Sequence, residues 1–188
     1  MPSRLTVLSG PSGVGKGTVV KAVRELFPHV WVSVSCTTRA PRPGERDGVE
    51  YHFLDDAEFE RRVQAGDFVE HAAYSGRRYG TLRSELERRT SAGAPVVLEI
   101  EVQGARQIRE TMPEAVRIFI APPSEEALRN RLVGRGTDDP EQVEARLRTA
   151  HEELAAQGEF PHVVVNDRLD DAVEALEEVV RSSLGSRA

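Results

Sequence analysis

The stretch of sequence that decides the fold is Gly10-Pro11-Ser12-Gly13-Val14-Gly15-Lys16-Gly17-Thr18. It fits the phosphate-binding pattern G-x-x-x-x-G-K. A short apolar run, Leu5–Ser9, precedes it and predicts a buried parallel strand. Apolar residues recur at helical spacing after it, and Pro28 ends the predicted helix. A strand, a glycine-rich loop and a helix in this order favour a nucleotide site over a glycine-rich turn without a ligand.

The chemistry of this loop suits ATP. Glycines let successive backbone N–H groups turn towards phosphate oxygens, and the N-terminus of the helix adds a favourable dipole. Lys16 is predicted to reach the β- and γ-phosphates and to be catalytic. The predicted ATP-binding residues of the loop are Gly10, Pro11, Ser12, Gly13, Val14, Gly15, Lys16, Gly17 and Thr18.

The magnesium ion that accompanies ATP has no obvious protein ligand. A hydroxyl usually follows the lysine, but Gly17 stands there and Thr18 comes next. Two alternatives remain open: Thr18 binds Mg²⁺, or phosphates and water hold it.

The rest of the chain alternates between strand-like and helix-like segments. We expect strands at Val32–Ser35, Tyr51–Leu54, Val96–Val102, Val116–Ile120 and Val163–Val165. We expect helices near Ala57–Ala65 and at Gly104–Thr111, Ser124–Val133, Pro140–Gln157 and Asp170–Leu184. This alternation predicts an α/β fold of the P-loop NTPase type, with a parallel sheet flanked by helices.

Composition excludes several other classes of protein. The net charge of −6 argues against a protein that binds nucleic acid through a general basic surface. No apolar run approaches the roughly 20 residues needed to cross a bilayer, so we expect no membrane partner. The N-terminus shows no signal-peptide pattern, and a single cysteine, Cys36, forms no internal disulfide. We therefore expect a cytoplasmic protein, whose protein partners the sequence leaves open.

A second set of motifs indicates what accepts the phosphoryl group. The residues of Ser33–Glu45, S-V-S-C-T-T-R-A-P-R-P-G-E, closely resemble the signature of the guanylate kinase family. The resemblance continues in order over essentially the whole chain, through Gly48–Phe53, Phe68–Glu70, Tyr79–Thr81, Leu98–Gly104, Ile120–Ser124, Gly134–Thr137 and Val164–Asp167. It implies reversible transfer from Mg·ATP to GMP or dGMP, giving ADP and GDP.

The resemblance also implies that the chain is divided into three structural regions. A core covers 1–32, 83–134 and 158–188, a small α/β insert that binds GMP covers 33–82, and a helical lid with the following helix covers 135–157. Arg39, Arg42, Tyr51 and Tyr79 look like the residues that hold the phosphate of GMP, a role that guanidinium forks and phenolic donors suit.

The guanine base needs acceptors, because it presents N1–H and N2–H₂ donors. By resemblance the readers are Ser35, Glu70, Thr81 and Glu101, with Glu70 making the main contact. Glu99 and Glu101 lie two apart on the predicted strand and so are expected on one face. Two departures from the family pattern are His71, where tryptophan is frequent, and Thr81, where serine is common but the hydroxyl is kept.

The resemblance to the family also implies a lid, whose characteristic residues are arginines. Arg131, Arg135 and Arg146 resemble lid residues that close on ATP and the transferred group, and with Arg39 and Lys16 they are the predicted catalytic residues. Positive charge around the equatorial oxygens is what phosphoryl transfer requires. The alternative is a charged, solvated pair of helices, because four glutamates lie nearby: Glu141, Glu144, Glu152 and Glu153. We accept that alternative for Arg129 and Arg148 only. Asn166 is expected near the adenine or ribose of ATP.

Two rival readings remain. The Gly-Lys-Gly-Thr run also resembles adenylate kinases, and a sugar bisphosphate kinase shares the architecture; the insert motifs disfavour both. A guanylate-kinase-like module that binds a phosphorylated peptide without chemistry is the second rival, and the intact phosphate loop argues against it.

Overall fold

The computed structural model describes residues 4–134 and 140–183, and its centre is a five-stranded parallel sheet. The strand order is β2 (Trp31–Val32), β7 (Val96–Glu99), β1 (Leu5–Ser9), β8 (Val116–Ala121) and β9 (His162–Val165). Every neighbouring pair in this sheet is parallel. The prediction of an α/β fold with a helix-flanked parallel sheet is therefore confirmed.

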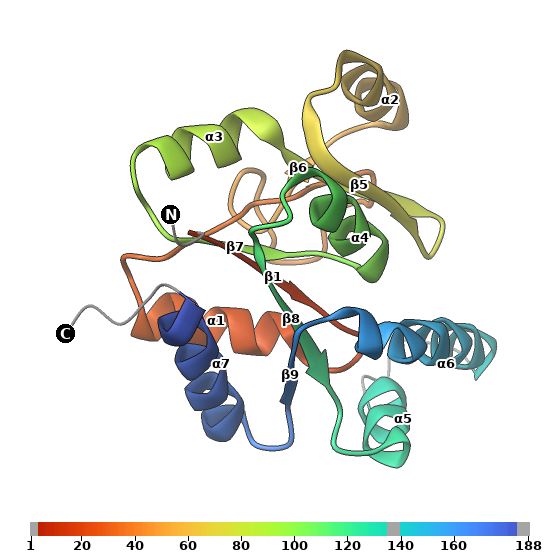
Figure 1. The fold of residues 1–188 in the computed structure, drawn as a ribbon. Helices are drawn as coiled ribbons and strands as arrows, with labels where there is room; N and C mark the ends of the chain where they lie inside the picture. Colours follow the sequence, from red (N-terminus) through yellow and green to blue (C-terminus); the bar gives the residue numbers. More distant parts are fainter. Residues whose placement is uncertain (1–3, 135–139, 184–188) are drawn as a thin grey trace.

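Helices cover both faces of this sheet (Figure 1). Alternate strand residues point to opposite faces, so Leu8 joins one core cluster and Val7 the other. The first cluster is completed by α1 (Lys16–Leu26), α5 (Glu125–Val133), α6 (Pro140–Ala155) and α7 (Leu169–Ser183). The second is completed by α3 (Arg83–Ser91), α4 (Val102–Thr111) and the 3-10 helix η1 (Ala156–Glu159).

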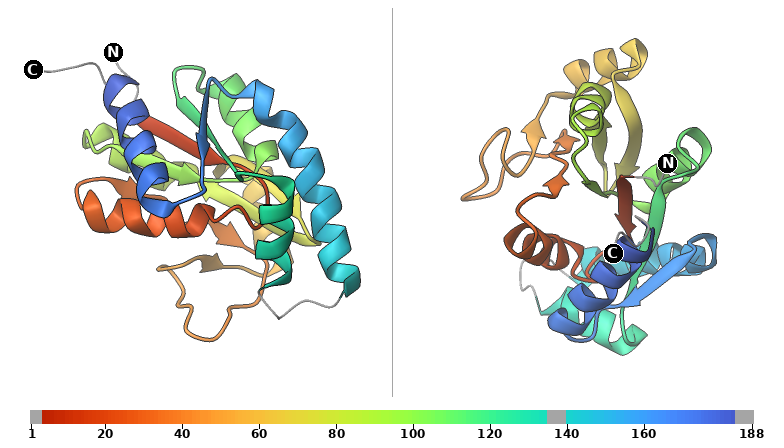
Figure 2. Two further views of the ribbon diagram at one scale, coloured as in Figure 1. Left: turned by 90° about the horizontal axis from the view of Figure 1, so that it is seen from below. Right: turned by 60° about the vertical axis from the view of Figure 1, so that its left-hand side comes forward.

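A second sheet forms a separate layer. Its four strands run in the order β4 (His52–Phe53), β3 (Cys36–Thr37), β6 (Arg77–Leu82) and β5 (Phe68–Tyr74), with α2 (Asp56–Ala65) packed beside them. All four strands lie inside the predicted 33–82 insert. Figure 2 shows the β5–β6 hairpin and α2 on the opposite side of the molecule from α5, α6 and α7.

Several predicted elements need correction. The predicted strand Val32–Ser35 is wrong in extent, because the chain leaves the first sheet after Val32 and enters the second at Cys36. The predicted strand Val96–Val102 ends at Glu99, because Glu101 caps α4 and Val102 is already helical. The predicted helix Pro140–Gln157 ends at Ala155 and continues as η1. The sequence analysis did not assign β5, β6 or α3.

The carboxyl ends of the parallel strands place the candidate site. The glycine-rich loop follows β1, Glu101 follows β7 and Asn166 follows β9. These ends meet at one edge of the sheet, where open α/β folds bind their ligands. Across the described residues, no helix is both long and apolar enough to cross a membrane.

Candidate active site

The phosphate loop is a tight turn that only glycine tolerates at key positions. Gly10 has φ +147, and a Cβ there would lie 2.3 Å from the carbonyl oxygen of Ile120. Gly15 has φ +94 and caps α1, which begins at Lys16. The loop therefore passes directly from β1 into a helix N-terminus, as the sequence pattern predicts.

Lys16 is folded back over its own loop. Its Nζ donates to the carbonyl oxygen of Gly10 and lies 3.7 Å from Oε2 of Glu101. The residue is only 9% exposed. Burial opposes the charge on Lys16, but the nearby carboxylates, Glu101, Glu153 and Glu99, raise its pKa overall. Lys16 is thus held as a buried cation among acids.

Helix α6 reaches the loop through two side chains. Glu153 accepts a hydrogen bond from the backbone N–H of Ser12, at 3.0 Å, and Arg146 Nη2 donates to Ser12 Oγ, at 3.2 Å. Glu153 is 8% exposed, so the alternative of a solvated charged surface does not hold for this residue. Burial, and next the negative charge of Glu101, raise the pKa of Glu153 to about 8.

The opposite side of the loop is held by Arg131 and Asn166. The carbonyl oxygen of Val14 accepts from Asn166 Nδ2, at 2.8 Å, and from Arg131 Nη1, at 3.1 Å. Arg131 Nη2 also donates to the carbonyl oxygen of Asn166, at 2.9 Å. Arg131 therefore ties α5 to the loop and to the residue after β9.

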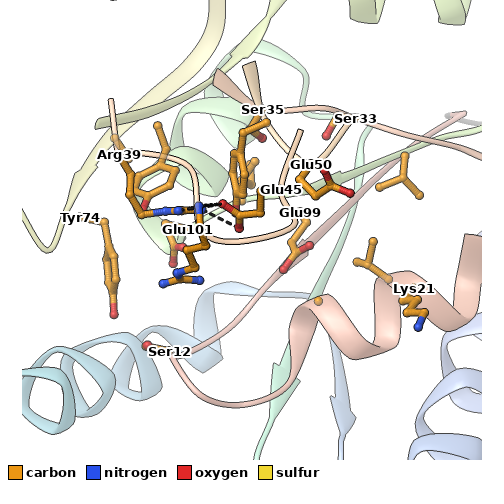
Figure 3. A pocket seen from close by; sticks show the side chains of 18 of the residues that line it. Ser12, Lys21, Ser33, Ser35, Arg39, Glu45, Glu50, Tyr74, Glu99 and Glu101 are labelled. Atoms are coloured by element: carbon orange, nitrogen blue, oxygen red, sulfur yellow. Dashed lines mark hydrogen bonds and ion pairs between the residues drawn. The ribbon is translucent and has the colours of Figure 1, made fainter. Parts of the chain in front are cut away.

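A pocket of about 370 Å³ joins the phosphate loop to the second sheet (Figure 3). Of the predicted site residues, those that line it are Ser12, Gly17, Ser35, Arg39, Arg42, Tyr51, Glu70, Tyr79, Glu101 and Arg146. In Figure 3, Glu99 lies between the Arg39–Glu45 pair and the helix that follows the loop. Groups from the phosphate loop and from the second sheet thus face one pocket.

Arg39 is positioned by a carboxylate and by aromatic rings. Its Nη1 and Nη2 donate to the two carboxylate oxygens of Glu45, each at 2.9 Å. The guanidinium also lies 5.2 Å from the ring centroid of Tyr51. The hydrogen bonds from Arg39 lower the pKa of Glu45, whose Oε2 also accepts from the backbone N–H of Arg42. Arg39 is thus fixed at the pocket, with its guanidinium fork occupied by Glu45.

Glu70 reaches the pocket because of a β-bulge. Strand β5 pairs Phe68 with Leu82 and Glu70 with Thr81, so one extra residue lies between Phe68 and Glu70. Thr81 and Leu82 are consecutive and point to opposite faces, and their partners do the same. Phe68 consequently packs in the core of the second sheet, whereas Glu70 faces the pocket.

The carboxyl group of Glu70 is almost completely buried. It is 3% exposed, and Thr81 Oγ1 donates to its Oε1 at 2.7 Å. Burial raises the pKa of Glu70 to about 7, although the hydrogen bond from Thr81 opposes this shift. The described residues provide no salt bridge to Glu70, so its acceptor capacity is directed at whatever fills the pocket.

Comparison with known proteins gives one consistent result. The guanylate kinase family model matches residues 2–183. A guanylate kinase of Frankia casuarinae is 59% identical over 94% of this chain and 96% of its own length. One from Thermobifida fusca is 56% identical over 93% of this chain and 89% of its own length. The chain belongs to the guanylate kinase family. The crystal structure of guanylate kinase from Anaplasma phagocytophilum superposes with a TM-score of 0.80, at 34% identity, over 97% of this chain and 87% of that one.

Membership of the guanylate kinase family makes the positions of the remaining predicted residues relevant. Lys16, Thr81, Arg131 and Asn166 do not line the pocket but contact the loop or a residue that does. Arg135, a predicted catalytic residue, lies outside the described residues.

Sequence reasoning missed three acids of the site: Glu45 and Glu50, which line the pocket, and Glu153, which contacts the phosphate loop. Glu45 stands within the family signature, but nothing in its local pattern indicates a bidentate pair with Arg39. The signal for Glu153 was available, because it lies seven residues after Arg146 and three after Ala150, on one face of a helix. Ala150 is completely buried, which places that face inside.

The sequence predicts that Mg²⁺ accompanies ATP, and the oxygen donors of the described residues suit this ion only in part. No group of three His, Cys, Asp or Glu side chains is gathered as metal ligands within residues 4–134 and 140–183. Thr18 lies on the exposed first turn of α1. A Cβ at Gly17 would lie 3.8 Å from Glu99 Oε1. The donor set therefore fits an ion that takes most of its ligands from phosphate and water.

Proposed function

We propose that this member of the guanylate kinase family transfers the γ-phosphoryl group of ATP directly to GMP or dGMP. The observation that carries the proposal is the single pocket that joins Glu70 of the second sheet to Ser12 and Gly17 of the phosphate loop. An acceptor bound at Glu70 and a donor bound on the loop would share this pocket. Direct transfer needs such proximity and in-line alignment.

At the acceptor end we propose that Glu70 reads guanine, assisted by Ser35, Thr81 and Glu101. An ionised carboxylate accepts from the N1–H and N2–H₂ donors of guanine, whereas adenine offers no such pair on that edge. A site built around a buried acceptor rejects a base that leaves it unpaired. The 3% exposure of Glu70 and its hydrogen bond from Thr81 support this role.

The phosphate of GMP is proposed to bind Arg39, Arg42, Tyr51 and Tyr79. Arg39 and Tyr51 already lie together, and the rings of Tyr51 and Tyr79 are 6.1 Å apart. Glu45 occupies the guanidinium fork of Arg39 in this structure. A dianionic phosphate would share this fork with Glu45 or replace it.

At the donor end we propose that Gly10–Thr18 and Asn166 bind ATP. Lys16 and the arginines Arg131, Arg135 and Arg146 would stabilise the charge of the transferred group. When bound, Mg²⁺ neutralises charge on the β- and γ-phosphates, and Thr18 is the proposed protein ligand beside phosphate and water. The role proposed for Arg146 is supported by its hydrogen bond from α6 to Ser12 of the phosphate loop. Closure of the 135–157 lid and of the 33–82 insert would exclude water. The cytoplasmic location stays a prediction.

The test is an acceptor screen with purified full-length protein. ATP and Mg²⁺ are supplied with GMP, dGMP, AMP, CMP or UMP, and ADP formation is measured against a blank without acceptor. We expect turnover with GMP and dGMP well above that with the other three. Turnover with AMP equal to that with GMP would contradict the proposal. Binding of a phosphorylated peptide without any ADP formation would identify the non-catalytic module instead.

A further inference from the structure

Helix α4 leaves a gap for the carboxyl group of Glu70. Gly104 is the third residue of this helix, and a Cβ built on it would lie 2.2 Å from Oε2 and 3.0 Å from Cδ of Glu70. Side-chain carbons do not approach an oxygen that closely, so any other residue at position 104 would displace the carboxyl group. Its other oxygen, Oε1, is fixed by Thr81.

The same helix fixes the backbone next to Glu70. Gln107 lies one turn after Gly104, and its Nε2 donates to the carbonyl oxygen of His71 at 2.6 Å. Its Oε1 accepts from the backbone N–H of His71 at 3.1 Å. β5 is an edge strand of its sheet, so this side-chain amide takes the place of a neighbouring strand. Gln107 thereby fixes the position of β5 relative to α4.

These contacts connect two parts of the fold at one residue. α4 packs on the five-stranded sheet, whereas Glu70 belongs to the second sheet. Glycine is a poor helix former, so helix stability alone does not favour it at position 104. Its lack of a side chain is what allows Glu70 to stand between Thr81 and α4.

We propose that Gly104 and Gln107 are positioning residues for guanine selectivity, because together they aim the Glu70 carboxyl group at the base. The inference rests on the proposed function, in which Glu70 reads guanine. Neither residue touches substrate; both act through Glu70 and the strand that carries it.

The experiment is a double-mutant cycle between Gly104→Ala and Glu70→Gln in the full-length protein. The kcat/KM values for GMP and for AMP are measured at saturating Mg·ATP, together with the KM for ATP. Gly158→Ala is the matched control, because a Cβ at Gly158 meets no atom within 4 Å. Gln107→Met is a second variant that keeps the length of the side chain and removes both hydrogen bonds to His71.

Gly104→Ala is expected to lower the GMP-to-AMP ratio of kcat/KM by about tenfold or more, mainly through the KM for GMP. The KM for ATP should change by less than about twofold. In the Glu70→Gln background the same substitution should lower the ratio by less than about twofold, because coupled residues are not additive. Gln107→Met should lower the ratio by about threefold, and Gly158→Ala should leave it unchanged.

Three outcomes separate this inference from the proposed function. If Glu70→Gln leaves the ratio unchanged, guanine is recognised elsewhere. The role proposed for Glu70 and this inference then fail, whereas transfer to GMP is still judged by the acceptor screen. If Glu70→Gln lowers the ratio but Gly104→Ala and Gln107→Met do not, the inference alone is overturned. A full additional loss from Gly104→Ala in the Glu70→Gln background would also overturn it, because Gly104 would then act independently of Glu70. Should Gly104→Ala fail to fold, Gln107→Met decides by the same ratio.

Discussion

At the Glu70 end of the pocket the carboxyl group accepts a hydrogen bond from a neutral hydroxyl. At the phosphate end, which comprises Arg39 beside the second sheet and Lys16 of the phosphate loop, cations instead face carboxylates of the same chain. Glu70 receives a hydroxyl from Thr81 and lies against the bare backbone of Gly104. Arg39 is instead paired with Glu45, and Lys16 lies beside Glu101. The first end offers an acceptor without a competing cation, and the second holds its cations with internal anions.

The difference indicates how each end would recognise its part of the substrates. A neutral, buried environment makes an unmatched base costly, which gives selectivity. Internal carboxylates orient the arginine and keep the buried lysine charged, and both cations must exchange partners when phosphate binds. On this view the base end determines which acceptor reacts, and the phosphate end determines how fast it reacts.

The largest expected effect tests the phosphate end. Lys16→Met should lower kcat at least about 100-fold, because one oriented positive donor to the transferred phosphoryl group is lost. The ratio of kcat/KM for GMP over AMP should stay nearly unchanged, since Glu70 is untouched. Steady-state kinetics with both acceptors measures this, with circular dichroism as the check on folding. A folded variant with nearly full turnover would show that Lys16 does not have this role.

The next effect separates binding from turnover among the arginines. Arg39→Ala should raise the KM for GMP by about tenfold to 100-fold, because a charge-assisted contact to the acceptor phosphate is lost before and during the reaction. Arg135→Ala should mainly lower kcat, and Arg135→Lys should rescue it only in part because a point charge does not replace a planar fork. Calorimetry gives the affinity for GMP separately. Normal turnover of Arg135→Ala, with weakened GMP binding, would reverse this division of roles.

Local sequence patterns predicted the elements that depend on local periodicity. Leu5–Ser9, the loop after it and the helices α1 and α7 follow from apolar spacing, glycine and proline, whereas α3 was not assigned. The second sheet was harder, because strands of two residues, such as Cys36–Thr37, carry no period. The β5–β6 hairpin contains a bulge, and Glu70 owes its direction to that extra residue rather than to alternation.

The sequence predicted which residues belong to the candidate site, but not which of their side chains contact each other. Arg39 and Glu70 stand in motifs, and both line the pocket. The pair of Arg39 with Glu45, and the approach of Glu153 to Ser12, depend on how loops and helices meet in space. The sequence showed Gly104 only as part of a family motif. Its importance comes from the space that it leaves for the carboxyl group of Glu70, 34 positions earlier, and this contact is not apparent from the sequence.

A pH effect tests whether the internal carboxylates at the phosphate end lower stability. The pKa of Glu153 in the folded protein is raised to about 8 from an ordinary value of 4.5. The folded state therefore binds the proton more tightly than the unfolded state, and the free energy of unfolding falls as pH rises through this window. Glu153→Gln removes the ionisation but keeps an oxygen that can accept from the N–H of Ser12.

The variant should match the wild type near pH 4.5 and exceed its free energy of unfolding by about 1–3 kcal/mol at pH 9. Urea unfolding at several pH values measures the difference, and Glu152→Gln, at an exposed neighbouring position, is the control. If the free energy of unfolding varies with pH in the same way for the wild type and for Glu153→Gln, the fold does not raise the pKa of Glu153.

The smallest expected effect concerns the missing hydroxyl after Lys16. A Cβ at Gly17 would meet Glu99 Oε1 only at 3.8 Å, an ordinary contact, so the backbone leaves room for the Cβ of a serine. Gly17→Ser should lower the Mg²⁺ concentration needed for half-maximal turnover, but by less than about tenfold, because Mg²⁺ takes most of its ligands from phosphate and water. Gly17→Ala is the matched control, since it adds the same carbon without the oxygen. If the serine and alanine variants have the same Mg²⁺ dependence, the hydroxyl is unnecessary, and the phosphate end relies on groups other than residue 17 to hold the ion.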